Sequence, residues 1–307
     1  MSRFRFPQAA LAIALACSAV ALAPVAQAAA PQARTQAPGF YRVLLGDFEV
    51  TALSDGTLAV DVDKVLHEPV ARTDAALAKS FLKSPVQTSV NGFLVNTGSK
   101  LVLIDTGTGG GFEPTAGSLL ANLKASGYTP EQVDDVLITH IHGDHVGGLT
   151  TKEGTAVFPN ATVHAGKADV DALLAKPNSA FAPYAAARHL QPVEGAVEVV
   201  PGIRAWPTPG HTAGHTSWIV ESGGQKLIAT GDLIHVASVQ LDDPSVTVSF
   251  DGDPRSAEAQ RAKVFAQAAK DGSLVAASHL QFPGIGHLRA NGKGWVFVPL
   301  NYAPSLK

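Results

Sequence analysis

Residues 139–149 read THIHGDHVGGL, and this stretch decides how the rest of the chain is interpreted. Three histidines and one aspartate stand within six positions: His140, His142, Asp144 and His145. Alternate residues of an extended chain point the same way, so His140 and His142 can bind one cation. The glycines of the stretch let the chain turn, so that Asp144 and His145 can face a second cation. Imidazole and carboxylate groups suit zinc, iron, manganese or cobalt, and the stretch therefore predicts a metal site.

Further ligands are expected downstream, because four ligands on one loop cannot complete the coordination of two ions. His211 follows a Pro-Gly turn in TPGHTAGH, and Asp232 follows an apolar strand in LIATGDLI. His279 follows another apolar strand in LVAASHL. Each of these signals is weak alone, since a single histidine after a strand is more often structural than a ligand. Their order and combination make the signal strong.

The order of these residues resembles that of the metallo-β-lactamase superfamily: HxHxDH, then TPGHTxGH, then GD, then a late histidine. The resemblance implies an α/β fold, a four-layer αβ/βα sandwich with a dinuclear metal site between the sheet edges. It also implies the ligands: one ion on His140, His142 and His211, the other on Asp144, His145 and His279, with Asp232 bridging both. Two divalent ions are therefore expected, zinc first, with manganese, cobalt or iron as alternatives.

The likeness extends from about residue 37 to residue 302, where the chain is similar to methyl parathion hydrolase and to dihydrocoumarin hydrolase-like lactonases. The long stretches 44–57, 89–107 and 276–287 carry it. These relatives hydrolyse neutral esters, so the resemblance implies a small-molecule ester as substrate, and it also implies a homodimer. We expect lactones or aryl esters first and organophosphate triesters as the alternative. A β-lactamase and a non-catalytic metal-binding module are less favoured.

The expected nucleophile is a hydroxide that bridges the two ions, because adjacent cations lower the pKa of a shared water. Asp144 is expected to orient this nucleophile or to carry its proton to the leaving group. His235 lies three residues after Asp232, so we expect it to face the pocket and contact a substrate oxygen or the leaving group. Asp144 and His235 are therefore the predicted catalytic residues.

Three further residues are expected to support the ligands. Asp105 ends the apolar run LVLID, and in the superfamily an aspartate at this place supports the ligand loop by hydrogen bonds. His215 matches a supporting position in the TPGHTxGH pattern. His287 follows the last ligand closely, in PGIGH, and is expected to lie just behind it.

An apolar, aromatic pocket suits neutral esters. Phe112, Phe250 and Phe282 stand near ligand segments and are expected to line such a pocket. Residues 177–188 look shorter and less aromatic than in the parathion-degrading relatives, and they offer only Phe181 and Tyr184. This departure favours lactones and aryl esters over phosphotriesters.

The composition is that of a folded globular chain of 307 residues, with 46% hydrophobic and 16% charged residues. A formal net charge of -3 argues against a nucleic-acid binder built on a basic surface, though not against a local basic patch, and no nucleic acid is expected as a partner. The one cysteine, Cys17, excludes a disulfide framework.

The N-terminal segment predicts a Sec-type signal peptide over residues 1–28, from Arg3 and Arg5, an apolar run over 9–23 and a small-x-small pattern at 26–28. We expect a periplasmic or secreted protein without stable membrane insertion after cleavage. Residues 29–39 are expected to form a flexible leader, and residues 40–303 a single metallo-β-lactamase-fold hydrolase domain. Within it, apolar patterns predict hairpins at 41–53 and 90–104, strands at 133–139, 216–221, 226–230 and 274–277, and helices at 119–126, 168–175 and 256–269.

Overall fold

A computed structural model describes residues 30–306 of the chain. The predicted signal peptide, residues 1–28, lies outside the described residues. The chain divides after Gln36, and the unit that begins at Ala37 holds every helix and strand of the described part. Residues 30–38, from the predicted leader, have no regular secondary structure and are exposed.

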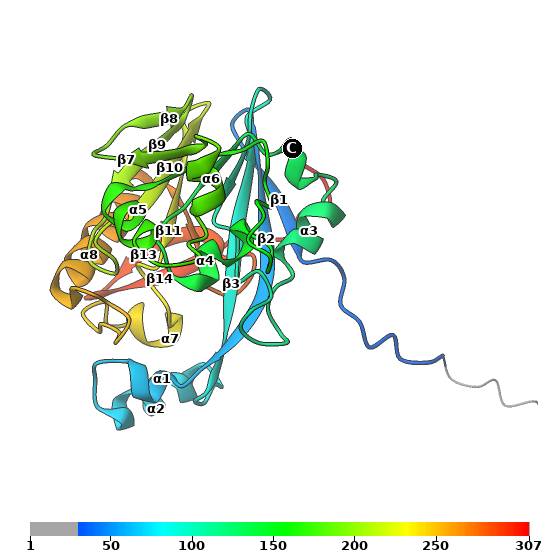
Figure 1. Cartoon of the computed structure of the whole chain (residues 1–307). Helices are drawn as coiled ribbons and strands as arrows, with labels where there is room; N and C mark the ends of the chain where they lie inside the picture. Colours follow the sequence, from blue (N-terminus) through cyan, green and yellow to red (C-terminus); the bar gives the residue numbers. More distant parts are fainter. Residues whose placement is uncertain (1–29, 307) are drawn as a thin grey trace, which may run out of the picture. The chain divides into compact units, whose positions relative to one another are not determined.

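Two seven-stranded sheets form the centre of the unit that begins at Ala37 (Figure 1). The first sheet holds its strands in chain order: β1 (Phe40–Leu45), β2 (Phe48–Val60), β3 (Val86–Asn96), β4 (Leu101–Ile104), β5 (Asp135–Leu137), β6 (Thr162–Gly166) and β7 (Leu190–Val193). The second sheet also holds its strands in sequential order: β8 (Glu198–Val200), β9 (Ile203–Pro207), β10 (Thr216–Ser222), β11 (Gln225–Gly231), β12 (Leu274–Ala277), β13 (Ile285–Asn291) and β14 (Gly294–Pro299). Neighbouring strands are antiparallel, except for the run from β4 to β7 and the pair β11–β12, which are parallel.

Helices cover the outer faces of both sheets. The first sheet packs against α3 (Leu119–Ala125), α5 (Lys167–Leu174) and α6 (Ala182–Ala186), and the second packs against α8 (Pro254–Asp271). A third apolar cluster, which includes Phe93 and Trp218, fills the space between the sheets. The order helix, sheet, sheet, helix confirms the predicted four-layer α/β sandwich. Four shorter helices lie in loops of the sandwich: α4 (Gly143–Val146), α7 (Ala237–Gln240), η1 (Pro130–Gln132) and η2 (Gly147–Leu149).

Central strands bury both of their faces, which explains why their sequences are continuous apolar runs. In β3, Phe93 and Val95 face the core between the sheets, whereas Leu94 faces the outer helices. In β10, Trp218 points inward and Ile219 points toward α8. The period of two residues along a strand therefore supplies two separate apolar layers from one stretch of sequence.

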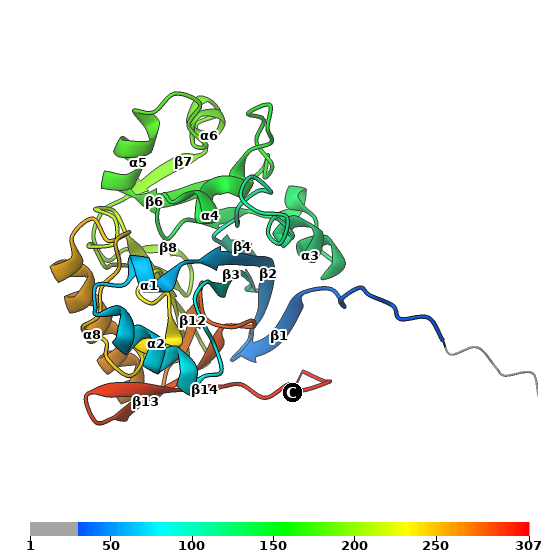
Figure 2. The same ribbon diagram turned by 90° about the horizontal axis from the view of Figure 1, so that it is seen from below.

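A helical arm leaves the sandwich between β2 and β3. It consists of α1 (Val62–Val65) and α2 (Val70–Lys79), and a fourth apolar cluster packs it against the segment that contains α7. Figure 1 shows the arm at the bottom of the unit, and Figure 2 looks onto it from below. The arm therefore joins a segment from the first half of the chain to a loop from the second half.

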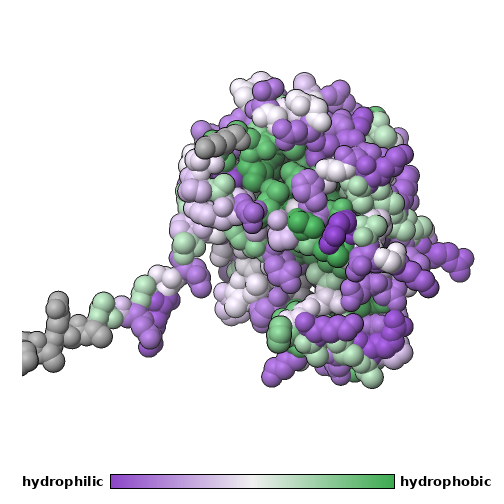
Figure 3. Space-filling view, turned by 180° about the vertical axis from the view of Figure 1, so that it is seen from behind, coloured by the Kyte–Doolittle hydropathy of each residue, from purple (hydrophilic) through white to green (hydrophobic). Residues whose placement is uncertain are grey.

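The strands and helices predicted from apolar patterns are present, with ends shifted by a few residues. The arm, β6 to β9, β13 and β14 were not predicted, because most of these elements are short or partly exposed. Within residues 30–306, no helix is both long and apolar enough to cross a membrane. The face opposite to that of Figure 1 is mainly hydrophilic, with one hollow where hydrophobic side chains gather (Figure 3).

Candidate metal centre

The predicted ligands lie at one edge of the sandwich because of the direction of four strands. His140 to His145 follow the end of β5, and Asp232 and His279 follow the ends of β11 and β12. His211 follows β9, which runs in the same direction as β11 because both pair with β10 in the antiparallel sense. In α/β sheets the crevice beyond the carboxyl ends of such strands is where ligands bind.

The structure brings all seven predicted ligands together in adjoining groups of donor atoms. In each group, one donor atom per residue lies within 4.8 Å of the others: His140, His142, His211 and Asp232 in the first, Asp144, His145 and His279 in the second. Asp232 faces both groups, since its Oδ2 lies 3.3 Å from His211 Nε2 and its Oδ1 lies 3.2 Å from His145 Nε2. This placement suits a carboxylate shared by two ions.

The arrangement of the donor atoms fits a bound cation. His142 Nδ1 lies 3.0 Å from His140 Nε2 and 2.9 Å from His211 Nε2, so three imidazole nitrogens converge on one point. His145 Nε2 and Asp232 Oδ1 are buried and have no hydrogen-bond partner among the described residues. Buried polar atoms without partners are costly, and a cation between them would satisfy these lone pairs.

Burial and mutual repulsion set the charges of the first group. Burial lowers the pKa of His140 well below its usual value, and it lowers the pKa of His142 to about 4. Burial alone would raise the pKa of Asp232, but the surrounding histidines, His145 foremost, hold it well below the usual range. Burial would lower the pKa of His211, but the carboxylates of Asp232 and Asp251 raise it to about 9. Neutral imidazoles and an ionised carboxylate are the forms that bind a metal, so His211 releases a proton when a cation binds.

Asp105 supports the ligand loop through three hydrogen bonds. Its carboxylate accepts from the backbone N–H and from the hydroxyl of Thr139, both at 2.8 Å, and it lies 2.8 Å from His145 Nδ1. The contact with Nδ1 leaves Nε2 of His145 free to face the centre. Asp105 adopts φ +58°, a conformation that costs energy for a residue other than glycine, and the hydrogen bonds of its carboxylate offset that cost.

His215 supports Asp232 rather than binding at the centre. The backbone N–H of Asp232 donates to His215 Nε2 at 3.1 Å, and His215 Nδ1 lies 2.8 Å from the hydroxyl of Thr208. A Cβ on Gly231 would lie 2.7 Å from His215 Nε2, so only glycine fits between the ring and the strand. Burial lowers the pKa of His215 to about 3, so the ring is neutral and can accept this bond.

Two further partners of the ligands were not predicted from the sequence. Asp251 Oδ1 lies 2.8 Å from His211 Nδ1, and the backbone carbonyl of Ser89 lies 2.8 Å from His279 Nδ1. Asp105, Asp251 and the carbonyl of Ser89 thus each contact the nitrogen of a ligand ring that faces away from the centre, and so fix the orientation of that ring. Asp251 stands in an irregular loop without a motif, and a backbone carbonyl leaves no sequence signal.

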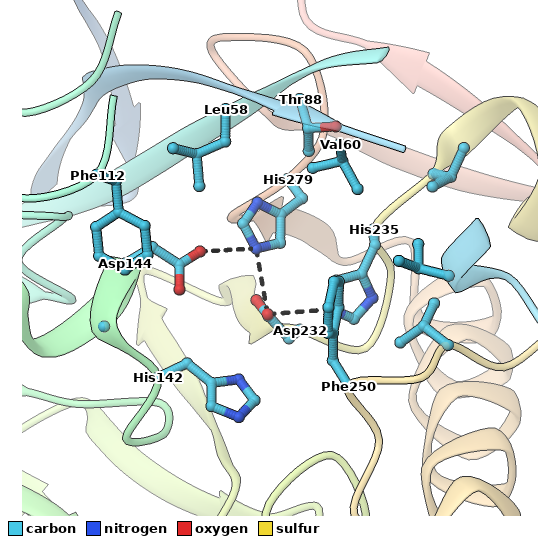
Figure 4. Close-up of a pocket in the computed structure, with 14 residues that line it drawn as sticks. Leu58, Val60, Thr88, Phe112, His142, Asp144, Asp232, His235, Phe250 and His279 are labelled. Carbon is cyan, nitrogen blue, oxygen red and sulfur yellow. Dashed lines mark hydrogen bonds and ion pairs between the residues drawn. The ribbon is translucent and has the colours of Figure 1, made fainter. Parts of the chain in front are cut away.

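A cavity of about 360 Å³ opens above the donor groups (Figure 4). Its floor is polar, and its walls are apolar with half-exposed aromatic rings. The floor consists of His142, Asp144, Asp232, His235 and His279, and the remaining lining consists of Leu58, Val60, Val65, Thr88, Phe112, Gly143, Val236, Val248 and Phe250. The predicted pocket residues Phe112 and Phe250 are 55% and 45% exposed, so their rings can meet an entering molecule.

The predictions for Phe282 and His287 are wrong. Phe282 packs against the core between the sheets and is not among the residues that line the cavity. His287 is exposed on β13 and pairs with Leu274, the first residue of β12, whereas His279 follows the last. Because the chain reverses after His279 into an antiparallel strand, a residue eight positions later returns to the far end of β12.

Phe181 and Tyr184 also lie outside the cavity lining. Both side chains are buried in the cluster between the first sheet and its helices. Tyr184 donates a hydrogen bond to the carbonyl of Leu149 at 2.8 Å. Residues 177–188 therefore add no aromatic ring to the lining of this cavity.

Comparisons with known proteins agree with this geometry. Residues 86–279 match the metallo-beta-lactamase superfamily. The chain belongs to this superfamily, and it is a metal-dependent hydrolase.

Individual relatives extend the comparison. The hydrolase AbOPH of the beta lactamase superfamily is 36% identical, with a TM-score of 0.83 over 88% of this chain and 100% of that one. AidC, a dizinc quorum-quenching lactonase solved with the product N-hexanoyl-L-homoserine, is 26% identical, with a TM-score of 0.78 over 86% of this chain and 98% of that one. The atrochrysone carboxyl ACP thioesterase of Passalora fulva is 34% identical over 47% of this chain, and the match spans 38% of the thioesterase.

Proposed function

We propose that the protein binds two divalent ions and hydrolyses neutral lactones and aryl esters. The proposal rests on one observation: donors from two adjoining groups stand on the floor of a cavity whose other walls are mainly apolar. Two such ions, when bound, lower the pKa of a water molecule and polarise a carbonyl oxygen. In this proposal Asp232 is shared between the ions, and zinc is the first candidate because of the imidazole-rich donor set.

The lining of the cavity favours an uncharged substrate. Among the described residues, no lysine or arginine lines it, and two carboxylates stand on its floor. An anionic substrate such as a β-lactam, which carries a carboxylate, would find no side-chain cation there to pair with. The similarity to the lactonase AidC supports a lactone or a related ester in particular.

Asp144 and His235 are the residues that we assign to the reaction itself. Burial would raise the pKa of Asp144, but His145 outweighs it and holds the pKa well below its usual value, so the ionised carboxylate can orient an attacking water by accepting a hydrogen bond from it. His235 Nε2 lies 3.1 Å from Asp232 Oδ2, and the ring stacks on His279 at the cavity floor. Burial lowers the pKa of His235 to about 4, so a neutral ring is available to hydrogen-bond a substrate oxygen.

A substrate panel tests the proposal. Dihydrocoumarin, p-nitrophenyl acetate, an acyl-homoserine lactone, methyl parathion and nitrocefin would each be assayed with the zinc, manganese and cobalt forms. We expect kcat/KM for at least one carboxyl ester to exceed that for methyl parathion by about tenfold or more, which corresponds to about 1.4 kcal/mol. A higher value for methyl parathion would instead establish an organophosphate triesterase, and a higher value for nitrocefin a β-lactamase.

A further inference from the structure

Asp251 holds two structural elements with the two oxygens of one carboxylate. Its side chain is fully buried. Oδ1 lies 2.8 Å from His211 Nδ1, and Oδ2 accepts a hydrogen bond from the backbone N–H of Val248 at 3.1 Å. The first contact orients a metal donor, whereas the second fixes a residue of the apolar cavity wall.

The contact with His211 determines which ring nitrogen faces the metal centre. When Nδ1 donates to Asp251, Nε2 keeps a lone pair that points toward His142 and Asp232. The loop of Asp251 also meets the turn of His211 through its backbone, since Gly252 N–H donates to the carbonyl of His211 at 3.0 Å. The loop of Asp251 and the turn of His211 are therefore joined by a side-chain contact and by a backbone hydrogen bond.

The contact with Val248 belongs to a short clasp between the arm and this loop. Leu66 and Val248 form an antiparallel bridge, and backbone hydrogen bonds join Ser249 to Val65 at 2.8 Å and His67 to Thr247 at 2.9 Å. Val65 and Val248 both line the cavity. The clasp thus forms the aliphatic wall from two segments that are far apart in the sequence.

We propose that Asp251 is a positioning residue with two roles. One oxygen of its carboxylate holds His211 and so helps to retain the metal, and the other holds Val248 and so helps to select the alkyl chain of the substrate. The second part rests on the proposed ester hydrolysis, because the aliphatic wall of Val65 and Val248 would contact the alkyl chain of an ester. Each methylene that becomes buried against this wall lowers KM by about fourfold.

Asp251→Asn tests both parts in a single change. An amide has one oxygen and one NH2 group, so it can accept from His211 or from Val248 but not from both. The matched control is Asp253→Asn, the same change two residues further on, where the side chain caps α8 by accepting from Ser256 N–H at 3.1 Å. Asparagine is an equally good cap, so the control keeps the helix.

Cobalt titration and a series of p-nitrophenyl esters provide the two readouts. In D251N we expect the cobalt concentration for half-saturation of the visible absorption bands to rise about 10- to 100-fold, the usual effect of losing a partner of a metal ligand. With cobalt in excess, we expect the dependence of KM on chain length from acetate to octanoate to fall to less than half of its unmutated slope. D253N should match the unmutated protein in both measurements.

Val248→Ala separates the effect on the wall from the effect on the metal. It shortens the side chain in the wall but keeps the backbone N–H that donates to Asp251. It should flatten the chain-length series and leave the cobalt titration unchanged. If D251N bound cobalt like D253N, Asp251 would not position His211. If D251N lost cobalt but kept the full chain-length slope, the link to the wall would be wrong.

A milder variant covers the case in which D251N does not fold. Thr247→Val removes only the contact of its hydroxyl with His67 Nδ1, at 2.9 Å, and loosens the clasp from a partly exposed position. It should flatten the chain-length slope, and an unchanged slope would overturn the role of the clasp. If no ester in the series is cleaved, the proposed function fails, while the cobalt titration still decides whether Asp251 positions His211.

Discussion

The floor and the wall of the cavity are built on opposite principles. On and directly beneath the floor, the rings of His279, His145 and His211 each have one nitrogen fixed by a hydrogen bond from outside the centre. The aliphatic wall has no such bonds between its side chains and is held by packing and by the backbone clasp at Val248. Substitutions on the floor should therefore cause large losses of activity, whereas substitutions in the wall should change KM by small steps.

The largest effect is expected on the floor, at the shared carboxylate. Asp232→Asn removes a charge that faces both donor groups, and the amide nitrogen cannot bind a cation. Loss of metal catalysis is worth several kcal/mol, so kcat/KM should fall by about 1000-fold or more. Metal analysis of the purified variant should show less than one ion per chain.

The control for this change is Asp47→Asn, an exposed aspartate in the hairpin between β1 and β2. It should keep both the metal content and the activity. Exhaustive removal of metal from the unmutated protein by a chelator should reproduce the loss seen in D232N. Full turnover by the chelated protein would contradict the assignment of the floor as a metal centre.

A smaller loss is expected one step away from the metal donors. Asp105→Asn keeps the size of the side chain, but its one oxygen cannot replace both Oδ1, which accepts from the backbone N–H of Thr139, and Oδ2, which contacts the Thr139 hydroxyl and His145 Nδ1. Changes of such partners cost about 10- to 100-fold in activity or metal affinity. The variant should recover part of its activity in excess zinc, and failure to respond to zinc would show that Asp105 acts only on folding.

The free energy of unfolding should depend on how the loop that carries Val248 is held in place. Arg261 on α8 is completely buried and donates to the carbonyls of Leu233, Pro244 and Val246. Arg261→Met would leave the carbonyls of Leu233 and Pro244 without their side-chain donor, whereas that of Val246 would keep Gln240 Nε2 at 3.0 Å. The free energy of unfolding should fall by about 2–4 kcal/mol.

Urea unfolding checks this effect, with Arg255→Met as the control because Arg255 is an exposed arginine on the same helix. We expect the change to disturb the wall more than the floor. R261M protein that still folds should therefore bind zinc but show a raised KM for the ester. An unchanged midpoint in urea would mean that water replaces the guanidinium at these carbonyls.

The same contrast explains what the sequence could reveal. His140 to His145 are adjacent, and Asp232 and His279 follow apolar strands that run in one direction, so their convergence could be predicted. Asp251 could not, because its place depends on a bridge between Val248 and Leu66, nearly two hundred positions apart. Val65 and Val248 look like ordinary core residues in a pattern of apolar positions.

The errors in the predicted site have the same origin. The expectation that His287 lies just behind His279 rests on their closeness in the sequence. Gly284, at φ +68°, lies in the turn that sends the chain back along β12, which carries His287 away from the centre. Proximity along the chain indicates proximity in space only until the next turn, and the turn itself was not predicted.

The smallest effect is expected at the mouth of the cavity. The ring of Phe250 is 45% exposed and lies 6.1 Å from the ring of His235, so it can contact a substrate without touching the donor atoms of the floor. Phe250→Ala should raise KM for aryl esters about three- to tenfold with kcat nearly unchanged, because it removes apolar contact that substrate and transition state share. Phe81→Ala, at a fully exposed phenylalanine outside the cavity lining, is the control. A fall in kcat at constant KM would instead mean that this ring acts on the reacting groups, and the division between floor and wall would then fail at Phe250.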